Sequence, residues 1–164
     1  MPTIVKALEE KGASVTVHHL KDFTPVWVDS RDLEAFPPEY KKLFDEVSLA
    51  NGIFFVTPIY NYTVSSPTKA LSEIIGDALE KKPVAIVTSA GTIRSHLATR
   101  DLMASMIYEQ KTICYSNTVQ VVEEMIENGT PNTDTTKRLT GLAHEFVSFV
   151  NALIPFCDEQ KTAE

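Results

Sequence analysis

The chain has 164 residues, of which 43% are hydrophobic and 23% are charged, a composition typical of one globular domain over residues 1–164 with room for a sizeable core. Its formal net charge of −7 argues against a nucleic-acid partner, because phosphate binding needs clustered Lys and Arg, and also against anionic membrane surfaces. The first residues include no long apolar stretch, and no segment approaches the roughly 18 apolar residues of a membrane span, so we expect a cytoplasmic protein without a membrane partner.

Residue types that carry metal and thiol chemistry are sparse and scattered. Cys114 and Cys157 lie far apart without a CxxC partner, so we interpret both as reduced thiols. The histidines at 18, 19, 96 and 144 have no metal-ligand spacing, and we expect no metal site. Ser89 and Ser95 lack a Gly-x-Ser-x-Gly elbow, which makes a hydrolase a weak interpretation.

The first part of the chain predicts a helix, an edge strand and a second helix. Ile4, Val5 and Leu8 precede Gly12, a glycine typical of a helix C-terminus. The stretch Ala13–His18 alternates apolar and polar residues, as an edge strand does. Apolar residues at helical spacing then predict a helix over Pro38–Val47.

The rest of the chain alternates strands and helices. Gly52–Val56 and Pro83–Thr88 are continuous apolar runs, typical of strands that are covered on both faces. A third, more polar strand is predicted from Thr112–Tyr115 together with Val119–Val122. The helices predicted beside these strands are Ser66–Leu79, Ile93–Tyr108 and Thr133–Ile154, the last closed by Pro155. This alternation predicts a parallel α/β sandwich.

Two short segments follow the two apolar strands, where ligands bind in open parallel sheets. Thr57-Pro58-Ile59-Tyr60-Asn61 combines a rigid proline, an aromatic ring and an amide, and Tyr62 follows it. A planar heteroaromatic ligand needs this mixture of apolar surface and polar groups. Ser89-Ala90-Gly91 is small, so that a flat ring could approach its backbone closely. We therefore expect the two segments to form one site for a flat ring.

The first segment, followed eight residues after Asn61 by Lys69, resembles the Thr-Pro-x-Tyr-Asn…Lys motif of the NADPH-dependent FMN reductases, which are flavodoxin-like flavoproteins. Lys82–Gly91 is similar to the next strand and ring-contact loop of that family. The resemblance implies a flavodoxin-like parallel sheet sandwiched by helices, FMN as cofactor and NAD(P)H as co-substrate. Carried over position by position, the residues that would contact the FMN ring are Pro58, Ile59, Tyr60 and Asn61 on one side and Ser89, Ala90 and Gly91 on the other.

The resemblance also implies an activity and an assembly. The expected reaction is hydride transfer from NAD(P)H to FMN, followed by reduction of a quinone, free flavin or similar small acceptor. The flavin performs the redox step, so we expect no catalytic side chain. A homodimer or homotetramer with the flavin near the subunit boundary is implied as well. Two alternatives are a degenerate, non-enzymatic member that acts as a structural or interaction subunit, and a flavodoxin-type electron carrier.

The sequence departs from the family pattern in several places. Ile59 stands where many members have Glu, Ser65 where many have Pro, and Ala70 where Asn is common. Family members begin with a strand and a Gly-Ser-x-Arg loop that grips the flavin phosphate, and this sequence has no counterpart of either. We expect either a truncated version of a longer protein or an inward shift of Ala13–His18 to pair with Gly52–Val56 in a smaller sheet.

Overall fold

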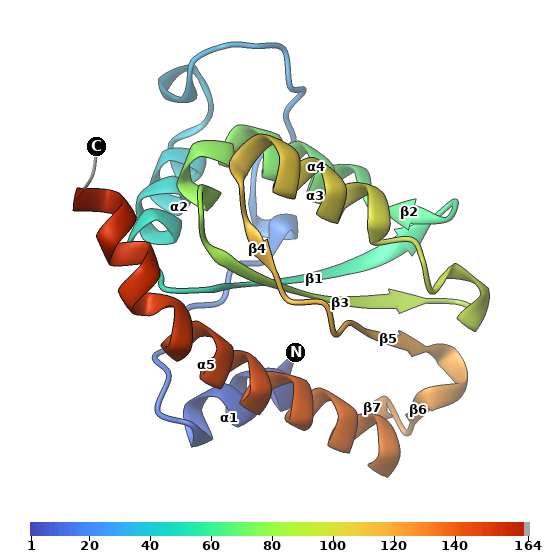
Figure 1. Cartoon of the computed structure of the whole chain (residues 1–164). Helices are drawn as coiled ribbons and strands as arrows, with labels where there is room; N and C mark the ends of the chain where they lie inside the picture. Colours follow the sequence, from blue (N-terminus) through green and yellow to red (C-terminus); the bar gives the residue numbers. More distant parts are fainter. Residues whose placement is uncertain (163–164) are drawn as a thin grey trace.

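The computed structural model describes residues 1–162 and the side chains of residues 1–156. Helices α2, α3 and α4 lie on one face of a central sheet, and α1 and α5 lie on the other (Figure 1). The expected α/β sandwich is therefore confirmed. In chain order the helices and strands are α1 (Pro2–Glu10), α2 (Pro38–Leu49), β1 (Ile53–Tyr60), β2 (Thr63–Val64), α3 (Ser66–Ile74), β3 (Pro83–Ala90), α4 (Arg100–Gln110), β4 (Ile113–Cys114), β5 (Val119–Val122), β6 (Ile126–Glu127), β7 (Thr130–Pro131) and α5 (Thr133–Thr162), with short 3-10 helices at Leu20–Asp22, Leu33–Ala35, Gly76–Leu79, Ile93–Ser95 and Glu123–Met125.

The central sheet is parallel around β3. Strands β1 and β3 run side by side from the pair Ile53 and Val84 to the pair Pro58 and Ser89. The short strands β4 and β5 both pair with β3 in parallel. Strand β2 folds back antiparallel on the last two residues of β1. Along residues 53–58, the edge of β1 away from β3 has no strand partner among the described residues.

Two apolar clusters fill the layers on either side of the sheet. The first lies under α2, α3 and α4 and includes Leu79, Ile86 and Met106, none of which is more than 1% exposed. The second joins α1 and α5 to the sheet through Ile4, Val87, Leu142 and their neighbours. Full burial of each such side chain contributes about 1.5–3 kcal/mol, so these clusters provide the main drive for folding.

Backbone geometry explains where the helices end. After α1, the amide of Gly12 donates to the Glu9 carbonyl and the amide of Ala13 donates to the Leu8 carbonyl, with Gly12 at φ 82°. This is a Schellman motif, in which glycine tolerates the left-handed conformation. The predicted helix Ser66–Leu79 divides at Gly76, where a side chain would crowd Gln110. The predicted helix over 93–108 begins late, at Arg100, after a separate 3-10 turn.

The segment Ala13–His18 has no regular secondary structure and joins no sheet, so the prediction of an edge strand there is wrong. The prediction that this segment shifts inward to pair with 52–56 is wrong for the same reason. The side chains of Ala13 and Val15 pack against the cluster under α1 and α5, while His18 bonds to Glu46 of α2. The alternation of apolar and polar residues therefore reflects a segment that packs one face against the core without forming the hydrogen-bonded ladder of a strand.

Helix α5 differs from expectation in two ways. It continues through Pro155 to Thr162, although proline lacks the amide that would bond to the Asn151 carbonyl. Both residues are exposed, so water can satisfy that carbonyl. By length and composition alone, its stretch Thr133–Phe156 could cross a membrane, with a mean hydropathy of 1.3, contrary to the expectation that no segment would qualify. This is weak evidence, because a helix that packs one face against a core passes the same test.

Candidate functional site

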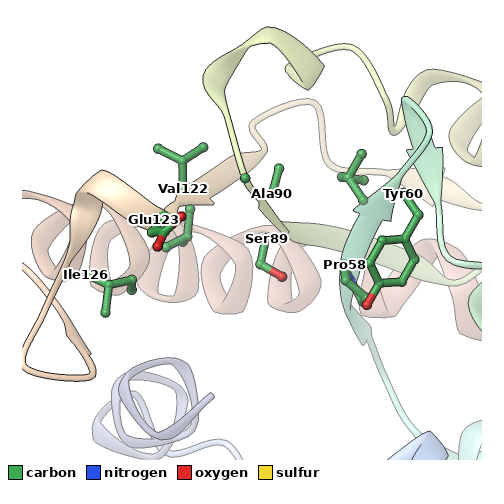
Figure 2. A pocket seen from close by; sticks show the side chains of 10 residues that line it. Pro58, Tyr60, Ser89, Ala90, Val122, Glu123 and Ile126 are labelled. Carbon is green, nitrogen blue, oxygen red and sulfur yellow. The ribbon is translucent and has the colours of Figure 1, made fainter.

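A groove with a volume of about 350 Å³ lies at the carboxyl ends of β1, β3 and β5. The sheet register places its walls, because Pro58 pairs with Ser89 and Ala90 pairs with Val122. Figure 2 shows Pro58 and Tyr60 on one side, Ser89 and Ala90 in the middle, and Val122, Glu123 and Ile126 on the other side. The lining residues are Pro58, Ile59, Tyr60, Ser89, Ala90, Gly91, Val121, Val122, Glu123 and Ile126.

Six of the seven residues predicted to contact a flat ring line this one groove, and Asn61 does not. Asn61 and Tyr62 form the turn between β1 and β2, with φ values of 49° and 66°. Positive φ at both central residues is typical of a type I′ hairpin turn, which Asn accepts easily and Tyr rarely. The segment predicted as a loop is thus the end of β1 and its hairpin turn. Likewise Ser89 and Ala90 belong to β3.

The third wall of the groove was not predicted. Val121 and Val122 come from β5, Glu123 from the 3-10 helix that follows it, and Ile126 from β6. A sequence signal existed, since Val119–Val122 was expected to be a strand and the carboxyl ends of parallel strands share one edge. Extending that rule to a third strand would have found Glu123. Among the described residues that line the groove, Glu123 is the one charged side chain.

Space around Gly91 is open. A side-chain carbon built there meets no atom within 4 Å, so the protein itself does not require glycine at this position. Ser89 is exposed and its side chain lies in the middle of the groove (Figure 2). A flat ligand could therefore approach the backbone of this segment directly.

The motif lysine lies outside the groove. Lys69 is on α3 and forms an ion pair with Glu73, one helical turn later, at 2.6 Å. Both side chains are nearly half exposed, so the pair contributes little to stability. Lys69 is not among the residues that line the groove.

The groove residues fit one part of FMN better than the other. Pro58 and Tyr60 offer apolar surface to the faces of an isoalloxazine ring, and the small residues 89–91 permit close backbone contact. A phosphate needs cationic or backbone N–H partners, whereas the charged residue that lines this groove is a carboxylate. The groove therefore fits the ring and does not fit the phosphate.

Comparison with solved structures gives the same architecture. An oxidoreductase from Corynebacterium diphtheriae aligns with a TM-score of 0.73 and 19% identity, over 92% of this chain and 84% of that chain. FerB, an NAD(P)H:(acceptor) oxidoreductase from Paracoccus denitrificans, aligns with a TM-score of 0.72 and 20% identity, over 92% and 87%. A flavodoxin from the domain Archaea aligns with a TM-score of 0.62 and 15% identity, over 92% and 87%. These likenesses confirm the flavodoxin-like fold.

Sequence comparison identifies the family. No curated protein matches the chain. The profile of the NADPH-dependent FMN reductases matches residues 2–124, which is well over half of the chain and includes the three strand ends that build the groove. This match supports a flavin-dependent oxidoreductase. The chain belongs to the NADPH-dependent FMN reductase family.

Proposed function

We propose that this chain is an NAD(P)H-dependent oxidoreductase that holds the ring of FMN in the groove and reduces a small acceptor such as a quinone or a free flavin. The observation that carries the proposal is the pairing of Pro58 with Ser89, which brings the two halves of the family motif to one ring-sized groove. The description of the matching family, NADPH-dependent FMN reductase, supports NAD(P)H as co-substrate.

The residues of the groove would bind and orient the ring. Pro58 offers a rigid apolar wall, Ile59 borders the groove although its side chain belongs to the core, and Ser89 and Gly91 let the ring approach the backbone. Tyr60 is 63% exposed at the rim, where its ring can cover a bound aromatic group and exclude water. When bound, FMN supplies the hydride chemistry, and the protein supplies position and hydrogen bonds.

We further propose that the chain works in the cytoplasm as a homodimer or homotetramer with the groove near the subunit boundary. Four large side chains next to the groove segments support this assembly: Tyr60, Tyr62, Ile93 and Leu97 are each more than half exposed. Large apolar side chains that are left exposed near a groove can belong to an interaction surface. Sedimentation of the purified chain tests the assembly.

Flavin binding and turnover test the function. The purified chain is titrated into FMN while quenching of flavin fluorescence is followed, and NADH or NADPH is then added anaerobically with benzoquinone. Binding followed by nicotinamide oxidation supports the reductase. Binding without nicotinamide oxidation indicates an electron carrier, and the absence of any flavin binding indicates a non-enzymatic member of the family.

A further inference from the structure

Three hydroxyl side chains form a closed cluster next to the Pro58–Tyr60 wall of the groove. The Oγ1 atom of Thr57 lies 2.7 Å from Oγ1 of Thr68 and 3.3 Å from Oγ of Ser65. The Ser65 and Thr68 hydroxyl oxygens are 2.9 Å apart. All three residues are buried, with 2%, 5% and 3% of Thr57, Ser65 and Thr68 exposed. We call Thr57, Ser65 and Thr68 the hydroxyl cluster.

Burying three hydroxyls is costly unless each finds a partner. In this cluster each hydroxyl can donate to a neighbour, and Thr57 also has the Pro58 carbonyl at 3.2 Å. Such linked hydrogen bonds strengthen one another in a low-dielectric interior. Apolar side chains of the same size would fill the space equally well. The specific contribution of the hydroxyls is therefore to fix how the joined residues are oriented relative to one another, because hydrogen bonds depend on angle and apolar contacts do not.

The cluster joins β1 to the N-terminal end of α3, whose N-cap residue is Ser65. Thr57 belongs to β1 and immediately precedes Pro58, Ser65 follows β2, and Thr68 lies in the first turn of α3. The hairpin that carries Tyr60 therefore begins and ends at the cluster. Its base is also closed by the backbone, since the Ser65 amide donates to the Pro58 carbonyl at 3.1 Å.

The position of this hairpin sets the width of the groove. The β3 ladder holds β1 as far as Pro58, and beyond that point β1 pairs only with β2 of its own hairpin among the described residues. Neither ladder fixes the angle between the hairpin and α3. The apolar contacts of Ile59 and Val64 with the core join the two elements, and the hydroxyl cluster adds directional hydrogen bonds between the root of the hairpin and the first turn of that helix.

We propose that the hydroxyl cluster positions the flavin site: the ladder fixes Pro58 opposite Ser89, and the cluster holds the hairpin beyond it, with Tyr60, at the separation from Ser89–Gly91 that a flavin ring requires. This inference rests on the proposed function, because it assumes that the groove binds a flavin. Thr57, Ser65 and Thr68 act through Pro58 and Tyr60, so they are positioning residues and not catalytic ones.

Removing one hydroxyl of the cluster at a time tests the proposal. Thr57→Val and Thr68→Val keep the side-chain shape and remove the hydrogen bonds, and Ser65→Ala is the mildest change if either valine variant fails to fold. We expect each to weaken FMN binding about five- to tenfold, the effect of losing one buried hydrogen bond. Thr57→Ser restores the hydroxyl and should restore binding. Thr88→Val is the matched control, because Thr88 is 5% exposed and pairs with Thr57 in the ladder but lies outside the cluster.

The readout is the dissociation constant for FMN, with the visible circular dichroism of bound flavin as a second measure of ring orientation. A double variant, Thr57→Val with Thr68→Val, should weaken binding no more than either single change, since both remove the same unit. Variants that lose thermal stability yet bind FMN like the wild type would overturn the positioning role and leave the proposed function intact. Failure of the wild-type chain itself to bind any flavin would overturn both.

Discussion

Pro58 lies directly opposite Ser89 in the parallel ladder between β1 and β3. This pairing brings residues that are far apart in the sequence to one groove, with Gly91 two positions beyond Ser89. A side-chain carbon at Gly91 would meet no protein atom, so the space in front of it is available to a ligand. The need for glycine there can therefore be tested separately from protein stability.

Gly91→Ala is expected to weaken FMN binding about tenfold while leaving the melting temperature unchanged, because the added methyl group enters the groove and touches nothing in the protein. Fluorescence quenching and thermal unfolding measure the two effects. Gly141→Ala is the control, since a side chain at Gly141 of α5 also meets open space. That variant should keep or raise stability, as alanine favours helix, and bind FMN normally. Equal FMN affinity in Gly91→Ala and the wild type would contradict a ring beside Gly91.

Glu123 should keep the groove from binding FMN more tightly than riboflavin, which lacks the phosphate. A carboxylate on the wall repels a second anion, so riboflavin is expected to bind at least as tightly as FMN. Glu123→Gln should tighten FMN binding about threefold and leave riboflavin binding unchanged. At high salt the effect of this substitution on FMN binding should be smaller, because salt screens the repulsion. Glu124→Gln, next to it but outside the groove lining, is the control. FMN binding more than about tenfold tighter than riboflavin binding would show that phosphate contacts dominate.

Local sequence patterns predicted two of the three walls of the groove. The continuous apolar run Pro83–Val87 marks a buried strand, whereas the run in β1 is only partly buried, with Val56 38% exposed. The rule that ligands bind at strand carboxyl ends then selects the segments 57–61 and 89–91, of which residues 58–60 and 89–91 line the groove. Burial is visible in a local pattern because it depends on the side chains themselves. The ring-binding motif is local as well, and residues 57–61 alone carry much of the resemblance.

Features that depend on distant partners could not be predicted. Ser89 and Ala90 continue β3 because Val121 and Val122 pair with them, and nothing near residue 89 indicates that pairing. The segment Ala13–His18 has a strand-like pattern but finds no ladder. The convergence of Thr57, Ser65 and Thr68 depends on how a hairpin meets a helix. Each is a tertiary contact that overrides or adds to the local pattern.

Lys82 is expected to stabilise the end of α2. It is 8% exposed, and its ammonium donates to the carbonyls of Ser48 and Ala50, each at 2.9 Å. These carbonyls lie at the helix C-terminus, where the helix itself cannot satisfy them. Lys82→Met keeps the apolar stem and removes the donors, so the free energy of unfolding should fall by about 2 kcal/mol. Urea unfolding followed by circular dichroism measures it.

The matched control for this change is Lys42→Met on the surface of α2, where the lysine side chain is 75% exposed. Its ion pair with Glu46, at 3.8 Å, is solvated, so the effect should stay below about 0.5 kcal/mol. If Lys82→Met is no less stable than Lys42→Met, the ammonium does not hold the helix end.

Glu39 should make stability depend on pH in the acid range. Its carboxylate accepts the Thr24 amide at 2.9 Å, and this backbone hydrogen bond holds the pKa of Glu39 below its ordinary value of 4.5. A lowered folded-state pKa stabilises the fold above pH 4.5, and the stabilisation is lost as pH falls through the folded-state value. Glu39→Gln should therefore melt below the wild type at neutral pH and converge with it in acid. Glu34→Gln, an exposed neighbour, should follow the wild type throughout. A melting difference that stays constant or widens on acidification would exclude this linkage.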